Sequence, residues 1–257
     1  MPGASLVAAC GVGGLVSGAA VHALAVRHGT DPDHDRPLSL PWSRCADCDV
    51  PMRGVERAPV LGAVVHHGRC RECGHVVGIG VLAVEVVNAL LWVAAAIRFG
   101  ASAPLIPYGL VFSGALVLAI VDLRTYRLPD RLTFPMLYGS GALVVVLSLV
   151  RHDAVRILYA AGGSLLFFGF LGAMALISPK GMGWGDVKLG RLLGLWLGWL
   201  SPLLVVYALL IAGLVGVAVG VVALVARRGR SAPYPFGPWL ALGAVVAIVA
   251  SPALLAT

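Results

Sequence analysis

The stretch GMGWGDVKL, residues 181–189, places one carboxylate among three glycines at alternate positions, and it separates two long apolar runs, 156–178 and 187–200. A run of about 20 apolar residues is long enough to cross the ~30 Å hydrocarbon core of a membrane. Glycines at this spacing favour a sharp turn of the backbone. The stretch therefore predicts a corner at the membrane edge that leads into a spanning helix and carries an acidic side chain.

The rest of the chain has the composition of a membrane protein. Of its 257 residues 59% are hydrophobic and 12% are charged, whereas about a quarter of a soluble domain is charged. The apolar runs lack the alternating pattern of barrel strands, so helices are expected to span. We predict an all-α polytopic membrane protein with about eight transmembrane helices, at residues 4–26, 77–97, 104–122, 132–150, 156–178, 187–200, 202–226 and 238–256.

The distribution of Lys and Arg predicts the orientation of these helices, because basic loops resist translocation. With the loop 27–76 in the cytoplasm, sixteen of the 19 basic residues lie on that side, and only Arg98, Arg151 and Arg156 lie on the other. Both termini are then expected to face outward. The net charge of +7 reflects this topology and attraction to anionic membrane lipids. We therefore expect no nucleic-acid partner.

The loop 27–76 contains two Cys-x-x-Cys pairs, Cys45 with Cys48 and Cys70 with Cys73. This spacing is typical of a four-thiolate structural zinc site. A cytoplasmic location would keep the thiols reduced, which disfavours disulfides. A loop of this size has little core of its own, so bound zinc would contribute to its folding.

Three acidic residues lie within or at the ends of the predicted spans: Glu85, Asp122 and Asp186. Ionisable groups at membrane depth are functional candidates. Asp122 ends the third span and Asp186 begins the sixth, so the topology puts both at the cytoplasmic face at similar depth. Glu85 stays open between a helix-packing role and a second site.

Two carboxyl groups that meet in a poorly hydrated site share a proton. The ionised member can take a proton from water while the protonated member polarises a peptide carbonyl. Asp122 and Asp186 therefore predict aspartic-protease chemistry at the membrane surface. Gly183 and Gly185, which lack Cβ atoms, would let a substrate backbone approach closely.

Simpler interpretations remain for each aspartate. Asp122 could pair with Arg124 or Arg127, and Asp186 could be a helix N-cap. For the whole chain, the alternatives are a proton- or cation-coupled transporter that uses the buried aspartates, and a zinc-binding assembly factor without chemistry of its own.

The motifs resemble those of the type IV prepilin peptidases, which are membrane aspartic peptidases. The resemblance is carried by Asp122 with Leu128-Pro129-Asp130, by the Gly-x-Gly-Asp motif at 183–186 followed by Val187-Lys188, and by GRCREC, APVLG (58–62) and PFGPWLALG (235–243). It implies that Asp122 and Asp186 are the catalytic pair, with Asp130 and Lys188 in supporting roles.

The resemblance further implies a multi-pass protein of the bacterial cytoplasmic membrane that cleaves the basic leader of pilin-like precursors at the cytoplasmic face, as in type IV pili or type II secretion. An N-terminal region, 1–100, would carry the cysteine loop, and 101–257 would form the peptidase domain. Members of the family also use S-adenosylmethionine to methylate the new N-terminus. The family pattern Gly-Ser-Phe-x-Asn-Val is absent from the first span, GLVSGAAVHALAVRHG (14–29). This departure predicts that methyl transfer is weak or absent.

Overall fold

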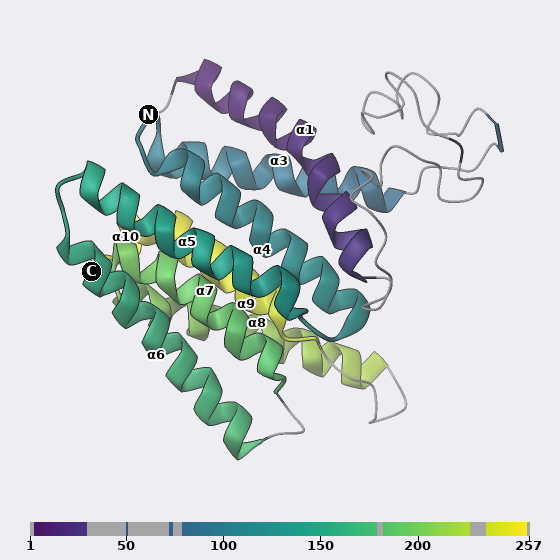
Figure 1. Ribbon diagram of the computed structural model, residues 1–257. Coiled ribbons are helices and arrows are strands. Elements are labelled where there is room, and N and C mark those ends of the chain that lie inside the picture. Colours follow the sequence, from purple (N-terminus) through teal and green to yellow (C-terminus); the bar gives the residue numbers. More distant parts are fainter. Residues whose placement is uncertain are drawn as a thin grey trace.

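The computed structural model describes residues 3–29, 50, 72–73, 79–178, 182–226 and 235–255. All regular secondary structure in these ranges is helical (Figure 1). The helices are α1 (Ala4–Gly29), α3 (Ile79–Phe99), α4 (Leu105–Thr125), α5 (Asp130–Val150), α6 (Val155–Ile177), α7 (Trp184–Leu200), α8 (Leu203–Ala226), α9 (Gly237–Val249) and α10 (Ser251–Leu254). The predicted all-α class is confirmed for the described part of the chain.

Each of the first seven predicted spans largely coincides with one helix. Among the described residues, six helices are long and apolar enough to cross a membrane: α1, α3, α4, α5, α6 and α8. Helix α7 has 17 residues and α9 has 13, so both are shorter than these six. The structure thus supports a multi-pass membrane protein, and the count of eight stays a prediction. Helix α1 begins and α10 ends at the same end of the bundle (Figure 1), as expected for two termini on one side.

The last predicted span, 238–256, is two helices rather than one. Helix α9 ends at Val249 and α10 starts at Ser251. The cause is Pro252, which has no N–H to donate to the carbonyl of Ile248. That carbonyl instead accepts hydrogen bonds from the Ser251 hydroxyl at 2.8 Å and from Arg98 Nε at 3.2 Å. The break therefore ties the end of α3 to the end of α9.

Helices α6 and α7 pack along a seam of glycines that holds their backbones close together. A Cβ atom added to Gly194 would lie 2.5 Å from the carbonyl oxygen of Gly163, and one added to Gly198 would lie 2.4 Å from that of Tyr159. Close packing through small residues is a common way for membrane helices to associate. This seam fixes the position of α7, the helix that carries Asp186.

A buried polar network joins α1, α3 and α4. Asn88 Nδ2 donates to the Gly14 carbonyl at 2.7 Å, and the Ser113 hydroxyl donates to Asn88 Oδ1 at 2.8 Å. Trp92 Nε1 completes the network by donating to the Ser113 hydroxyl at 3.0 Å. Since an unsatisfied polar group in the membrane interior is costly, the network fixes how α4 lies against the two N-terminal helices.

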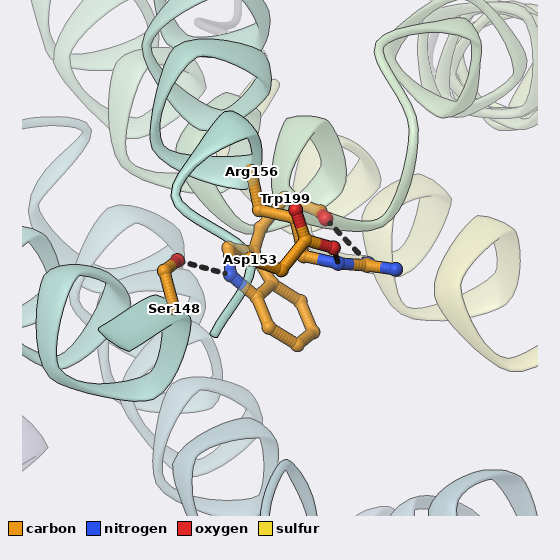
Figure 2. A network of polar contacts seen from close by, with 4 residues as sticks. All are labelled: Ser148, Asp153, Arg156 and Trp199. Carbon is orange, nitrogen blue, oxygen red and sulfur yellow. Dashed lines mark hydrogen bonds and ion pairs between the residues drawn. The ribbon is translucent and has the colours of Figure 1, made fainter. Parts of the chain in front are cut away.

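The end of the bundle opposite the aspartates is held by Trp199 at the C-terminal end of α7 (Figure 2). Its Nε1 donates to the Ser148 hydroxyl on α5 at 2.9 Å, and its carbonyl accepts from Arg156 Nη1 on α6 at 3.1 Å. Arg156 also pairs with Asp153 at 2.7 Å. Helices α5, α6 and α7 are therefore joined at this end. Arg156 also caps the Trp199 ring, with its guanidinium carbon 4.9 Å from the ring centroid.

Candidate active site

Asp122 lies in the last turn of α4 and is buried, with 6% of its surface exposed. The helix continues three residues beyond the predicted end of the span, to Thr125, and Tyr126 then terminates it in the left-handed conformation with φ 54°. Tyr126 donates its N–H to the Asp122 carbonyl at 2.8 Å. The aspartate side chain is thus fixed inside a helix rather than in the following loop.

The side chain of Asp122 is held by Gly237, the first residue of α9. The Gly237 N–H donates to Asp122 Oδ2 at 3.0 Å. The first N–H groups of a helix have no intrahelical partner, and together with the helix dipole they favour a negative charge. The contact therefore favours the ionised form of the Asp122 carboxyl group.

No role was predicted for Gly237. Its signal in the sequence was the Gly237-Pro238 pair within PFGPWLALG, because proline is common in the first turn of a helix. Space also requires glycine here: an added Cβ would lie 2.6 Å from Asp122 Oδ2. Figure 1 shows α9 lying within the bundle, where it packs against both α4 and α7.

Asp186 lies in the first turn of α7, which begins at Trp184. It is 8% exposed. The interpretation of Asp186 as an N-cap is wrong, because Gly183 occupies the N-cap position and no side chain caps the helix. Asp186 instead donates its backbone N–H to the Gly183 carbonyl at 3.1 Å, and its carboxyl group lies beside Gly183, whose backbone forms a hydrogen bond with it.

The two carboxyl groups interact, as predicted from the topology. Asp186 lies outside the six long apolar helices. Burial and the nearby Asp122 carboxyl group raise the pKa of Asp186 from 3.8 to about 7. A backbone hydrogen bond at Gly183 has a smaller, opposing effect on this pKa. A carboxyl group with this pKa is about half protonated at pH 7 and mostly protonated below it. The pair therefore combines an Asp186 that can hold a proton near neutral pH with an Asp122 whose ionised form is favoured by a fixed backbone donor.

The alternative pairing of Asp122 with Arg124 or Arg127 is not found. Within the described ranges, the structure contains no ion pair between Asp122 and either arginine, and the hydrogen-bond donor to its side chain is Gly237. A carboxylate neutralised by arginine would be a poor base. Because Asp122 forms no such ion pair with Arg124 or Arg127, its carboxyl group is available for proton transfer.

The two charged residues with predicted supporting roles lie together. Lys188 Nζ on α7 pairs with Asp130 Oδ1 at the start of α5. The ammonium group also lies 5.6 Å from the centre of the Phe134 ring. Because Asp130 begins the helix after the α4–α5 turn and Lys188 follows Asp186 by two residues, the pair connects the segments next to both aspartates.

The two glycines of the motif have different surroundings. A Cβ atom added to Gly185 would lie 3.2 Å from Leu128 Cβ, so this glycine lets the α4–α5 turn pack against the start of α7. A Cβ atom added to Gly183 would lie 3.8 Å from Asp186 Oδ2, which is ordinary contact. The close approach at Gly185 is therefore made by the chain's own Leu128. Gly183 keeps an open, exposed backbone beside the carboxyl group.

Three of the four predicted zinc ligands, Cys45, Cys48 and Cys70, lie outside the described residues. Cys73 is described and exposed. In the ranges that the structure describes, no group of three or more His, Cys, Asp or Glu side chains could hold a metal. Zinc binding therefore stays a prediction.

Glu85 is buried on α3, where Gly18 of α1 packs against it.

Comparison with known proteins agrees with the motifs. The model of the "Type IV leader peptidase family" matches residues 109–221, and that of the "Bacterial Peptidase A24 N-terminal domain" matches residues 12–99. No solved structure gives a significant match.

Curated relatives match over most of the chain. The prepilin leader peptidase/N-methyltransferase of Aeromonas hydrophila is 34% identical over 214 residues, which cover 82% of this chain and 72% of the relative. The protein of the same name from Bacillus subtilis (strain 168) is 32% identical and covers 82% and 84%, respectively. That of Pseudomonas putida is 33% identical and covers 84% and 75%.

The all-helical membrane fold brings together two buried aspartates, an arrangement suited to the chemistry of an aspartic peptidase. The chain belongs to the type IV leader peptidase family, and it is an enzyme of that family. The predicted resemblance is confirmed.

Proposed function

We propose that this protein is a membrane aspartic endopeptidase that cleaves the basic leader from type IV prepilin-like precursors. The observation that carries the proposal is the interaction of two buried carboxyl groups, in which the pKa of Asp186 is raised to about 7 and Asp122 accepts a backbone hydrogen bond from Gly237. The names of the relatives, which include prepilin leader peptidase, support this substrate class. Family membership favours this function over a transporter or a non-catalytic assembly factor.

In the proposed mechanism, the Asp122 carboxylate takes a proton from the attacking water, and the Asp186 carboxyl group donates its proton to the oxygen of the scissile carbonyl. Water oxygen bonds to the carbonyl carbon and gives a tetrahedral intermediate. The proton on Asp122 then passes to the departing amine as the C–N bond breaks, and the intermediate returns a proton to Asp186 as the new carboxyl group forms. Proton transfer of this kind contributes about 10²–10⁴-fold to rate.

Asp130 and Lys188 are proposed to support the pair by holding the α4–α5 turn against the start of α7. Gly183 is proposed to leave room for the substrate backbone beside Asp186. Gly185 has a supporting role of another kind, since it accommodates Leu128. None of these four residues takes part in proton transfer in this scheme.

We place the active site and the cysteine loop at the cytoplasmic face of the bacterial inner membrane, on the excess of Lys and Arg in the connecting segments. The proposed division is an N-terminal region at 1–100 and a peptidase domain at 101–257, with the loop 27–76 holding zinc through Cys45, Cys48, Cys70 and Cys73. The boundary falls between the ranges that the two family models match, 12–99 and 109–221.

Methyl transfer is the second candidate function. It is favoured by the word N-methyltransferase in the names of the relatives and by the match to the N-terminal domain model. The absence of the family pattern Gly-Ser-Phe-x-Asn-Val from the first span instead predicts that methyl transfer is weak or absent. Incubation of the purified enzyme with precursor and labelled S-adenosylmethionine decides between them, because stoichiometric label on the new N-terminus requires both activities.

The proposed peptidase is tested by reconstituting the purified chain in liposomes with a pilin-like precursor that carries a basic leader before an apolar helix. We expect a single cleavage at the end of the leader, identified by sequencing the new N-terminus. If the precursor stayed intact while the same liposomes conducted protons or cations, the transporter alternative would replace the proposal.

A further inference from the structure

An apolar groove lies between three of the helices that form the site. It has a volume of about 200 Å³ and is lined by α4, α5 and α7, which Figure 1 shows running side by side. Ser140 contributes the one hydroxyl group to the lining; the other lining residues are Leu110, Val111, Met136, Gly139, Leu143 and Leu192. The groove is thus suited to an apolar occupant.

The groove lies about two to four helical turns deeper in the bundle than the acidic residues. Leu192 follows Asp186 by six residues, which is about 9 Å along a helix that rises 1.5 Å per residue. Leu143 follows Asp130 by thirteen residues, which is about 20 Å. The groove therefore lies between the proposed cleavage level and the opposite side of the bundle.

The α4–α5 side of the groove has an adaptable wall. Met136 fills the space beside Gly114, where an added Cβ would lie 2.3 Å from the methionine methyl carbon. A methionine side chain is flexible and can repack around a ligand. Gly139 leaves the groove open, because an added Cβ there meets no atom within 4 Å.

We propose that this groove receives apolar side chains of the helix that follows the scissile bond of the precursor. The inference rests on the proposed function. All three walls belong to helices that carry Asp122, Asp130 or Asp186, so a helix packed against the groove would present the residues before it to the two carboxyl groups. Such positioning lowers the entropy lost in reaching the reactive geometry. The other apolar occupant available in a membrane is a lipid acyl chain.

Helix α5 offers a matched pair of substitutions that tests the groove. Gly139 lines it, whereas Gly141 lies about 200° further around α5 and also has no atom within 4 Å of an added Cβ. We expect Gly139→Leu to raise the KM for the precursor at least tenfold with kcat within about twofold of wild type. Gly141→Leu should change neither value more than twofold. Normal KM and kcat in Gly139→Leu would overturn the groove proposal and leave the proposed peptidase standing.

Photo-crosslinking tests occupancy without cleavage. A p-benzoylphenylalanine at position 139, combined with Asp122→Asn, should crosslink to the apolar segment of the precursor in liposomes, and the same probe at position 141 should not. Crosslinks from position 139 to lipid alone would overturn the proposal. If the wild-type enzyme left the precursor uncut while position 139 still crosslinked to it, the proposed peptidase function would fail and the docking surface would not.

Discussion

Gly237 and Asp122 are separated by 115 positions in the chain, yet the Gly237 N–H donates a 3.0 Å hydrogen bond to Asp122 Oδ2 in the interior of the bundle. Asp122 is the residue that ends a long apolar run, and Gly237 starts a helix of its own. Their contact makes the N-terminus of α9 a part of the candidate active site. It also gives the two aspartates unequal surroundings, because the donated hydrogen bond favours the ionised form of Asp122.

Replacement of either carboxyl group by an amide should abolish cleavage. Asp122→Asn cannot accept a proton from water and Asp186→Asn cannot supply one, so each is expected to lower kcat at least 10³-fold. The measurement is single-turnover cleavage of the precursor, with membrane abundance compared by immunoblot. Near-normal turnover in either variant would exclude the two-aspartate mechanism.

Gly237→Ala should impair catalysis through Asp122. A methyl group would lie 2.6 Å from Asp122 Oδ2 and displace it from its donor. Hydrogen bonds to charged groups contribute about 1.5–3 kcal/mol, so kcat should fall about 10- to 100-fold with KM little changed. The control is Gly213→Ala on α8, where an added Cβ meets no atom within 4 Å. Equal loss in both variants would contradict a specific role for Gly237.

Peptidase activity should fall as the pH rises through about 7. The raised pKa of Asp186, about 7, means that the side chain is protonated below this pH and ionised above it. Above pH 7 the pair has no proton to donate to the scissile carbonyl. The log of kcat/KM should therefore decrease with a slope near −1 on the alkaline side. Activity that increased from pH 7 to 9 would show that Asp186 is not the acid.

The Asp130–Lys188 pair should have a smaller effect. Its side chains are 56% and 32% exposed, and exposed ion pairs contribute at most about 1 kcal/mol. Lys188→Ala is expected to lower kcat/KM by no more than about fivefold. The exchange Asp130→Lys with Lys188→Asp should restore most of that loss. A loss of 100-fold that the exchange fails to restore would mean that Lys188 acts directly on the substrate.

Freshly purified, reduced protein should contain about one zinc ion per chain. Cys45→Ser with Cys48→Ser should remove the metal and lower the abundance of the protein more than its turnover per molecule. Cys10→Ser is the matched control, since Cys10 is a half-buried residue of α1. Elemental analysis decides the matter, and zinc-free wild-type protein would refute the site.

The sequence predicts most of the fold because transmembrane helices can be identified from the length and composition of apolar runs. It also predicts that Asp122 and Asp186 share one face, because helix direction alternates along the chain. It does not predict the hydrogen bond from Gly237 to Asp122. Every residue except proline has a backbone N–H, and only the position of this N–H in the fold makes it a donor to the carboxyl group. The packing role of the glycines at 194 and 198 was not predicted either, because it depends on which face of α7 contacts α6.

The break between α9 and α10 at Ala250 is a second feature that the sequence alone did not predict. Pro252 was visible in the sequence, but the apolar run continues through it, and the effect on the helix depends on new partners for the Ile248 carbonyl. Proline is tolerated in membrane helices where such partners exist. Arg98, 150 positions earlier in the chain, is one of them.

The glycine seam between α6 and α7 leaves no space for even a methyl group between the two backbones. Two helices in such contact cannot slide or rotate independently, so they move as one rigid body. Any adjustment that changes the separation of Asp186 from Asp122 must therefore carry α6 as well. Through this contact, displacements of α6 are transmitted to the helix that carries Asp186.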